Sequence, residues 1–421
     1  MIMNKNPVNG MRDILPGEMA LRNYVLDVIR KTYRSYGFTE METPIVESIE
    51  NLTGKNGGEN EKLTFQILKR GEKLDLETAK TITDVADSGL RYDLTMPLSR
   101  YYAAHNAELI KPFKALQIGP VFRAERPQKG RYREFYQCDI DILGDATNQA
   151  EIELILATAA AIGNLGFKNV VIRINDRRIL KAMVLHAGLP EEDADRIFIT
   201  LDKMDKIGID GVRETLLSDG VSETSAEKLL SLFSEENGSD DQSVLTRLGQ
   251  ELYGDPDAPV IRNLRQIFTV VNAAKESEFT LRFDPTLVRG MGYYTGPIFE
   301  IAVPEFSSSV GGGGRYDEMI GRFVGQNTPA CGFSIGFERI VEILSDRRTE
   351  VPGGTEKTAI LLEKGLSDEK RTEALKAANQ MRAAGKTVLT AVMAKNKKFQ
   401  KEQLAAEGFG NILEFYEKPL E

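Results

Sequence analysis

Two strand-like stretches joined by a short basic loop limit the folds that this chain can adopt. Residues 116–125 and 135–143 have the composition of strands, and the loop 126–131 (RPQKGR) connects them. A connection this short returns the chain as an antiparallel hairpin, because parallel neighbours need a crossover of about a dozen residues or more. The sequence therefore predicts an antiparallel sheet built around this hairpin.

The second strand of the hairpin has one polar face. Alternation along a strand places Phe135, Gln137, Asp139 and Asp141 on the same side, opposite an apolar side. Two carboxylates and an amide on the inner side of a sheet are costly if they remain unpaired. A ligand with positive charge and hydrogen-bond donors would remove that cost. The alternative is an antiparallel strand with one solvated face, which the segment taken alone favours.

Positive charge is concentrated in the same region. The chain of 421 residues has a net charge of −9, which argues against a protein that coats nucleic acid indiscriminately. Residues 111–133, however, contain seven Lys or Arg and a single acid, Glu125. The planar fork of an arginine side chain suits phosphate. An acidic chain with one basic stretch predicts a docked polyanion.

The remaining pattern predicts an α+β fold. Short connections join further strand-like stretches, so we expect a mostly antiparallel sheet with helices packed against it. Residues 38–46 look extended, and Pro44 suits a sheet edge or an interface. Helical spacing marks residues 18–36, which end before Gly37, and residues 150–166. Further strands are expected at residues 170–175, 279–283 and 293–303.

The length of the chain predicts more than one domain. We expect a core domain from residues 1–187 and 258–347, and a helical insertion at 188–257, which is acidic and poor in strand signals. A linker follows the core, and residues 356–421 alternate strand and helix as a small α/β domain. The sequence has no apolar run near the roughly 20 residues of a membrane span and no secretory signal at its start, so we expect a cytoplasmic protein without a membrane segment.

A signature of one enzyme class lies in the hairpin. Phe122, Arg123, Glu125, Arg131 and Phe135 match the pattern F-R-x-E, a loop, then R-x-x-x-F. This pattern resembles the second signature motif of class II aminoacyl-tRNA synthetases. The resemblance implies that Arg123 binds the α-phosphate of ATP, Glu125 the adenine amino group and Arg131 the γ-phosphate. It also implies that Phe135 stacks on adenine.

The other two motifs of this class have counterparts in the chain. Residues 332–339 (GFSIGFER) resemble the third motif, whose arginine, here Arg339, contacts the γ-phosphate from the other side. Without the family, this segment is merely a glycine-rich junction between a strand and a helix. Residues 37–47 resemble the first motif, which implies a homodimer through the region around Pro44.

Two glycine-containing segments indicate histidine as the amino acid. Residues 287–296 (LVRGMGYYTG) and 309–317 (SVGGGGRYD) resemble the two histidine-specific signatures of histidyl-tRNA synthetases. The resemblance implies a catalytic role for Arg289 and an imidazole pocket lined by Tyr293 and Tyr294. A phosphate-binding loop is the rival interpretation of the glycine run, but the lysine and Ser/Thr of such a loop do not follow.

The resemblance also implies how the amino acid is held. The stretch LRYDLT matches the family, so Asp93 and Thr95 would bind the α-amino group, with Gln137 near the same end. Asp141 would pair with an imidazole nitrogen, with Tyr294 on the opposite side. Pairing both ring nitrogens would discriminate histidine, because a pocket built to satisfy hydrogen bonds rejects analogues that lack them.

The implied reaction has two steps. Histidine attacks ATP, with Mg²⁺ as cofactor, to give histidyl-adenylate, and the histidyl group then passes to tRNA(His). Arg289 and Arg123 would stabilise the charge that develops during the first step. Arg126 and Gln128 in the hairpin loop would touch the acceptor end of the tRNA. The sequence assigns no metal-ligating residue.

The chief alternative function is regulatory. A synthetase-like paralogue serves as the regulatory subunit of ATP phosphoribosyltransferase and binds histidine without charging tRNA. Like that paralogue, this chain would have a shortened anticodon-binding-like domain, because the family's domain usually continues beyond the length of residues 356–421. The retained arginines favour the enzyme, since a regulator does not need a complete ATP grip. These arginines are Arg123, Arg131, Arg289 and Arg339.

Overall fold

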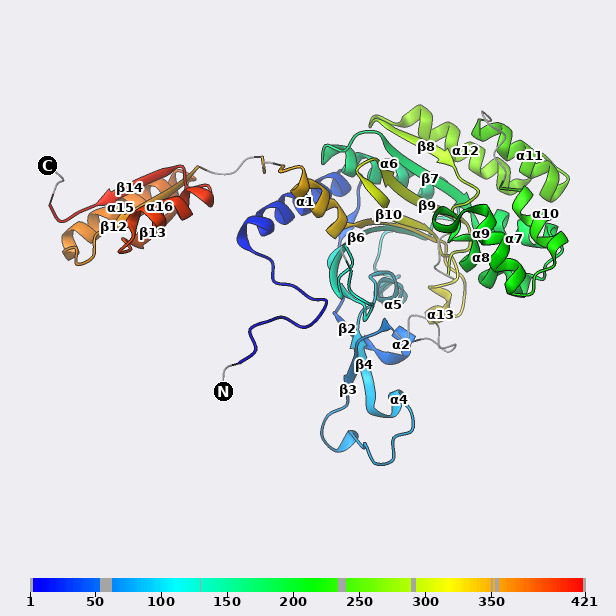
Figure 1. The fold of residues 1–421 in the computed structure, drawn as a ribbon, viewed down its shortest axis with the longest axis horizontal. Helices are drawn as coiled ribbons and strands as arrows, with labels where there is room; N and C mark the ends of the chain where they lie inside the picture. Colours follow the sequence, from blue (N-terminus) through cyan, green and yellow to red (C-terminus); the bar gives the residue numbers. More distant parts are fainter. Residues whose placement is uncertain are drawn as a thin grey trace. The chain divides into compact units, whose positions relative to one another are not determined.

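The computed structural model of the chain describes residues 3–53, 63–128, 130–233, 240–288, 293–349, 351–352 and 356–418 (Figure 1). The chain forms two compact units. The first comprises Met1–Asp13 and Val25–Arg347, and the second comprises Ile14–Tyr24 and Arg348–Glu421. Among the described residues, no helix combines the length and the apolar character needed to cross a membrane.

An eight-stranded sheet forms the centre of the first unit. Its six inner strands are joined to one another by antiparallel ladders, and a parallel pair closes each edge. The predicted α+β class with a mostly antiparallel sheet is therefore confirmed. In spatial order the strands are β1 (Thr39–Glu40), β5 (Phe113–Phe122), β6 (Glu134–Leu143), β11 (Ala330–Gly336), β10 (Phe306–Arg315), β9 (Pro297–Val303), β7 (Val170–Asp176) and β8 (Phe279–Phe283).

The predicted hairpin lies inside this sheet. Strands β5 and β6 pair over their whole length, with Gln117 opposite Asp139 and Ala115 opposite Asp141. The first strand is shifted toward the N-terminus relative to the prediction. It ends at Phe122, although the backbone amide of Arg123 still donates to the carbonyl of Arg133 in the same register, at 2.9 Å.

Helices cover the sheet by burying one face each. In α1 (Pro16–Ser35), Val25, Ile29 and Tyr33 are fully buried at a four-residue spacing, and Gly37 follows with a positive φ of 80°. Helix α6 (Gln149–Asn164) contacts β6, β7 and β11. Helix α14 (Phe337–Asp346) continues directly from β11 and contacts β6 and β10.

Two further predicted extended segments differ from the structure in extent. Of residues 38–46, only Thr39–Glu40 pairs in the large sheet, at its edge, and Val46 begins β2 (Val46–Ser48). Strand β9 begins at Pro297, so both tyrosines of the first histidine signature precede it. A small sheet that the sequence did not predict joins β2 to β4 (Ala86–Leu90) and β3 (Gln66–Leu68).

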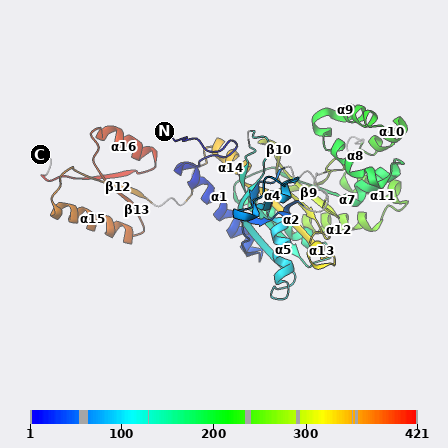
Figure 2. The ribbon, with the colours of Figure 1, turned by 90° about the horizontal axis from the view of Figure 1, so that it is seen from below.

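All regular secondary structure that the structure describes within residues 188–257 is helical. Figures 1 and 2 both show these helices gathered beside α7 (Arg177–His186) and α12 (Pro259–Ala274), and close contacts join α11 to both. The group consists of a short 3₁₀ turn at Glu191–Asp193, α8 (Ala194–Leu201), α9 (Met204–Ser218), α10 (Glu223–Ser231) and α11 (Asp241–Tyr253).

The second unit contains a small parallel sheet. Strand β12 (Lys357–Leu362) lies between β13 (Thr387–Val392) and β14 (Asn411–Phe415). Helices α15 (Asp368–Ala383) and α16 (Lys397–Ala406) connect the strands. The predicted order of strand, helix, strand, helix and strand is confirmed.

The remaining described elements are short, apart from α5. They are α2 (Ile49–Thr53), a 3₁₀ turn at Gly71–Lys73, α4 (Ile82–Val85), α5 (Thr95–His105) and α13 (Gly321–Val324).

Candidate active site

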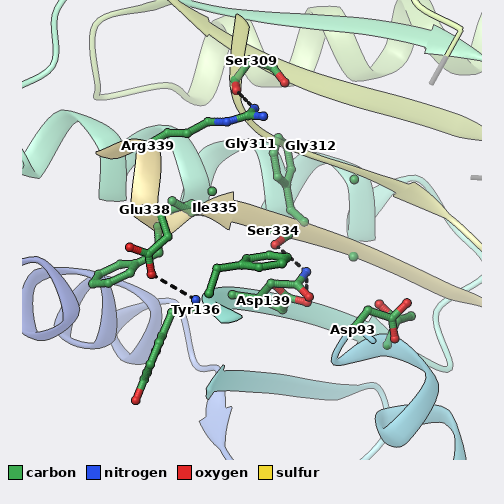
Figure 3. Close-up of a pocket in the computed structure, with 18 of the residues that line it drawn as sticks. Asp93, Tyr136, Asp139, Ser309, Gly311, Gly312, Ser334, Ile335, Glu338 and Arg339 are labelled. Carbon is green, nitrogen blue, oxygen red and sulfur yellow. Dashed lines mark hydrogen bonds between the residues drawn. The ribbon is translucent and has the colours of Figure 1, made fainter. Parts of the chain in front are cut away.

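A cavity of about 300 Å³ lies over one face of the large sheet (Figure 3). Its walls come from the hairpin, the glycine-rich strand β10, strand β11 and the start of helix α14. The cavity brings together residues that lie far apart in the sequence. Of the predicted site residues, it is lined by Asp93, Thr95, Arg123, Glu125, Arg131, Phe135, Gln137, Asp141, Tyr293, Tyr294 and Arg339.

Three predicted site residues are not among the described residues that line the cavity. Arg289 falls outside the described residues. Arg126 and Gln128 are exposed in the hairpin loop and do not line the cavity. The backbone groups of Gln128 and Arg131 bond to each other across this loop, at 2.9 and 3.2 Å.

The polar face of β6 points into the cavity. Asp139 and Asp141 are only 4% and 3% exposed, and both line the cavity together with Gln137. The alternative of a solvated strand face is therefore wrong for the two aspartates. The inner face of the sheet carries buried carboxylates, the costly arrangement for which the sequence predicts a ligand.

Glycines allow these carboxylates to fit. A Cβ atom on Gly332, which pairs with Asp141 across the β6–β11 ladder, would lie 1.9 Å from Asp141 Oδ1. A Cβ atom on Gly313 would lie 2.0 Å from the carbonyl oxygen of Gly332. Side chains at these two positions would displace the aspartate or separate the strands. The glycine run thus forms the floor of the cavity by close backbone approach.

Aromatic side chains surround Asp141. The Tyr316 hydroxyl donates to Asp141 Oδ1 at 2.6 Å. The ring of Tyr293 meets that of Tyr294 edge-on with 4.8 Å between centroids, and that of Tyr316 with 6.1 Å. The role of Tyr316 was not predicted, although this residue lies within the second histidine signature. A contact between side chains 175 residues apart left no local signal.

The carboxyl group of Asp141 has an unusual acidity. Burial raises the pKa of Asp141 to about 7, the nearby Asp93 adds to the rise, and the hydrogen bond from Tyr316 opposes it. Because an unfolded aspartate has a pKa near 4, the native protein binds a proton that the unfolded chain lacks between about pH 4 and pH 7. The ionisation of Asp141 therefore lowers the free energy of unfolding as the pH rises through this window, and the loss levels off above about pH 7.

Replacing Asp141 with asparagine removes this titration and keeps an oxygen for Tyr316. The stability of Asp141→Asn relative to the wild type should therefore increase by roughly 3 kcal/mol between pH 5 and pH 8. Urea unfolding of both proteins across this range measures the difference. A difference that does not change with pH would show that Asp141 does not titrate in this window.

The arginines of the cavity are held in place by the protein itself. The guanidinium of Arg123 lies between the rings of Tyr92 and Phe135, at 4.3 and 5.0 Å from their centroids, and its Nε donates to the Tyr92 carbonyl at 3.2 Å. Arg339 donates to the carbonyl of Ser309 (Figure 3). Positioned guanidinium groups suit a phosphate chain, because little rearrangement is needed when the anion binds.

The carboxylate of Glu125 faces one of these cations. Arg131 Nη1 lies 3.5 Å from Glu125 Oε2, and Arg131 is exposed at the mouth of the cavity. Among the described residues, no group of three or more His, Cys, Asp or Glu side chains is arranged to hold a metal ion.

Residues of the N-terminal segment, Gly10 and Arg12, contact the hairpin and the start of α14. Arg12 forms an ion pair with Glu338 at 3.3 Å and lies over the ring of Tyr132, 4.6 Å from its centroid. Glu338 also accepts a hydrogen bond from the backbone amide of Tyr136 at 3.2 Å (Figure 3). The amide of Arg133 donates to the carbonyl of Gly10 at 2.8 Å. Local sequence pattern does not indicate these contacts, because their partners are distant in the chain.

A buried ion pair anchors the end of β10. Arg315 and Glu151 are 8% and 1% exposed, and their two hydrogen bonds are 2.6 and 2.7 Å long. Arg315 also donates to the carbonyls of Asp145 and Thr147. The pair ties α6 to the strand that forms the cavity floor.

A mostly antiparallel sheet that carries the F-R-x-E hairpin, together with the Arg339 junction between strand and helix, defines a class II aminoacyl-tRNA synthetase. Residues 10–340 match the family model of histidyl-tRNA synthetase. This chain belongs to the histidyl-tRNA synthetase family.

Individual relatives agree with the family. The chain is 47% identical to the histidine–tRNA ligase of Leifsonia xyli subsp. xyli, over 96% of this chain and 93% of the relative. It is 40% identical to the probable histidine–tRNA ligase of Tropheryma whipplei, over 97% and 95%. The crystal structure of histidyl-tRNA synthetase from Nostoc sp. PCC 7120 is similar with a TM-score of 0.77 at 26% identity, over 97% and 90% of the two chains.

A second solved structure has the same fold and a double description. It is described as an ATP phosphoribosyltransferase regulatory subunit/histidyl-tRNA synthetase from Bacillus halodurans C, with a TM-score of 0.76 at 23% identity, over 98% of both chains. This likeness shows the fold alone. The ligases at 47% and 40% identity favour the enzyme over the regulatory alternative.

Proposed function

We propose that this protein activates L-histidine with ATP and transfers the histidyl group to tRNA(His). One observation carries the proposal: a single cavity combines buried carboxylates at Asp93, Asp139 and Asp141 with positioned arginines at Arg123 and Arg339. The carboxylates suit the two nitrogen-bearing ends of histidine, and the arginines suit a triphosphate. A class II synthetase needs both in one place, so that the two substrates meet.

The chemistry requires no covalent protein nucleophile. The carboxylate of histidine attacks the α-phosphorus of ATP, and the bond to the bridging oxygen breaks to release pyrophosphate. A hydroxyl of the terminal tRNA ribose then attacks the carbonyl carbon of the adenylate and releases AMP. Such displacements depend on positioning and on neutralising negative charge. We assign this task to Arg123, at the α-phosphate, and to Arg289.

The remaining ATP contacts follow from the motifs and the cavity. Phe135 supplies a ring against which adenine stacks, and Glu125 accepts a hydrogen bond from the adenine amino group. Arg131 and Arg339 bind the γ-phosphate. Arg131 is exposed at the mouth and its partner Glu125 lines the cavity, so ATP would replace a loose ion pair rather than a buried one.

The histidine contacts occupy the other part of the cavity. Asp93, Thr95 and Gln137 bind the α-amino group. Asp141 and Tyr294 pair with the imidazole ring, and Tyr293 and Arg289 complete the site. The aromatic residues support this assignment, because Tyr316 bonds to Asp141 and its ring meets that of Tyr293, so apolar rings lie beside a carboxylate that can pair with a ring nitrogen.

Several partners are part of the proposal. Mg²⁺ enters with ATP and takes most of its ligands from phosphates and water, a mode that needs few protein carboxylates. Arg126 and Gln128, exposed in the loop, contact the tRNA acceptor end. The protein acts in the cytoplasm as a homodimer through the region around Pro44, next to the exposed side chains of Ile45 and Val46.

Pyrophosphate exchange into ATP, measured with each amino acid in turn, tests the proposal. We expect exchange that depends on histidine alone, followed by histidylation of tRNA(His) when tRNA is added. Histidine binding without exchange would overturn the proposal in favour of the regulatory function. Exchange with a different amino acid would overturn the assignment of the substrate.

A further inference from the structure

We propose that Asp139 is a direct ligand of the substrate's α-ammonium group, in addition to the residues that the family motifs assign to it. This inference rests on the proposed function, because it takes histidine as the amino acid in the cavity. Asp139 lies on β6 between Gln137 and Asp141 on the same strand face, and it belongs to none of the matched motif positions.

An unpartnered oxygen is the first observation. Asp139 is 4% exposed and lines the cavity, and its Oδ1 atom has no hydrogen-bond partner among the described residues. Its Oδ2 atom accepts a long bond of 3.4 Å from Gln137 Nε2, and the hydroxyl of Ser334 also interacts with the carboxyl group. A buried carboxylate oxygen without a donor is unfavourable. The cavity is the direction from which a donor can reach it.

The charges around Asp139 indicate that this donor is a cation. Burial raises the pKa of Asp139 well above its usual range, and the carboxylates of Asp141 and Asp93 raise it further. The hydroxyl of Ser334 and the charge of Arg123 act in the opposite direction. Arg123 itself is held between two rings and donates to a backbone carbonyl. A positively charged ligand would relieve the repulsion among the three carboxylates.

The position of Asp139 along β6 indicates that it contacts the α-ammonium group of histidine and not the imidazole ring. Residues two apart on a strand are separated by about 7 Å, so Asp139 and Asp141 present carboxylates at two points along the cavity. This spacing is comparable with the distance from the α-nitrogen of histidine to the far side of its ring. Asp141 lies among the tyrosines, at the aromatic end. Asp139 and Asp93 both line the cavity, and both are labelled in Figure 3.

Gln137 supports the same arrangement. Its Nε2 atom donates to Ser334 Oγ at 3.2 Å, which leaves Oε1 facing the cavity without a partner among the described residues. An ammonium group has three N–H donors. Oxygens of Asp139, Asp93 and Gln137 would supply three acceptors, one for each donor.

The test uses Asp139→Asn, which keeps the shape of the side chain and removes its charge. Calorimetry measures the binding of three ligands to the full-length protein: histidine, histamine, which keeps the amino group but lacks the carboxylate, and imidazolepropionate, which lacks the amino group. We expect Asp139→Asn to weaken histidine and histamine by about 10- to 100-fold, the scale of one charged hydrogen bond. Imidazolepropionate should bind unchanged or more tightly. In pyrophosphate exchange, KM for histidine should rise while KM for ATP stays the same.

Asp176→Asn is the matched control. Asp176 is a fully buried aspartate in β7 of the same sheet and does not line the cavity. The Asp176→Asn variant should have the same ratio of histamine affinity to imidazolepropionate affinity as the wild type. Asp139→Ala, which lacks any polar atom, provides a second variant if asparagine perturbs folding, and thermal unfolding monitors both.

The outcomes separate the two proposals. Equal weakening of all three ligands, or of none, would overturn the role of Asp139 even if the wild type performs histidine-dependent exchange. Because all three ligands carry the imidazole ring, equal weakening of the three would assign Asp139 to the ring instead of the ammonium group. A wild type that binds histidine but does not catalyse exchange would overturn the proposed function, while the ligand series would still decide the role of Asp139. A wild type that binds none of the three would overturn both.

Discussion

Replacing Arg123 with alanine is expected to reduce histidine-dependent pyrophosphate exchange by about 10²- to 10³-fold, the scale of removing one preorganised donor from a transition state. The guanidinium is held between the rings of Tyr92 and Phe135 before any substrate binds, so its charge needs no reorganisation when the α-phosphate becomes more negative. The alanine substitution removes the positive charge and also the guanidinium plane that packs on the rings of Tyr92 and Phe135. We expect the loss mainly in kcat, because the contact strengthens in the transition state.

Two further variants make this result specific. Arg123→Lys keeps the charge but lacks the planar fork, so it should recover only part of the rate. Arg322→Ala removes an exposed arginine of α13 outside the cavity and should exchange at the wild-type rate. A rate within a few-fold of the wild type in Arg123→Ala would exclude Arg123 from the catalytic step.

Replacing Glu151 with alanine should reduce the free energy of unfolding by about 2 to 4 kcal/mol, because Arg315 stays buried and loses its buried partner, while the partly exposed carboxylate of Asp317 remains 3.2 Å from its Nη1 atom. Both side chains are nearly inaccessible and their two hydrogen bonds are short and parallel. Urea unfolding followed by far-ultraviolet circular dichroism gives the change. The variant should also bind histidine poorly at temperatures at which the wild type is stable, since α6 and β10 lose their connection.

The matched control replaces both partners with apolar residues of similar size, as in Glu151→Leu combined with Arg315→Met. Removing both charges together avoids the unpaired charge, so the double variant should be more stable than Glu151→Ala. A loss below about 1 kcal/mol in the single variant would show that water or another group compensates Arg315.

Local pattern was sufficient to predict the hairpin and its inward face. Alternation alone placed Gln137, Asp139 and Asp141 together, and all three line the cavity. Glycine and periodicity located α1, and the order of elements in the second unit followed from alternating patterns. These features depend on neighbours in the chain, which is why the sequence reveals them.

Contacts between distant segments were not predictable in the same way. The Tyr316 hydroxyl bonds to Asp141, Arg12 reaches Glu338, and nothing in the spacing of these residues announces either pair. Strand ends also escaped prediction: β5 ends at Phe122, before the predicted end at Glu125, although the amide of Arg123 still bonds to the carbonyl of Arg133 in the register of the ladder. Only the family resemblance indicated histidine as the amino acid, because the charge and polarity of the cavity residues would suit any small cation.

The glycines that form the floor of the cavity restrict how this site can evolve by substitution. Four consecutive glycines in β10, Gly311 to Gly314, lose more conformational entropy on folding than alanines would, roughly 2 to 4 kcal/mol in total. The Arg315–Glu151 pair follows them immediately and holds the strand at its end. Mutations are therefore restricted in two ways. Larger side chains do not fit at the glycine positions, and loss of the Arg315–Glu151 pair would leave the conformational entropy cost of β10 without the ion pair that offsets it. A change of amino acid specificity on this scaffold would have to arise on β6 and among the tyrosines.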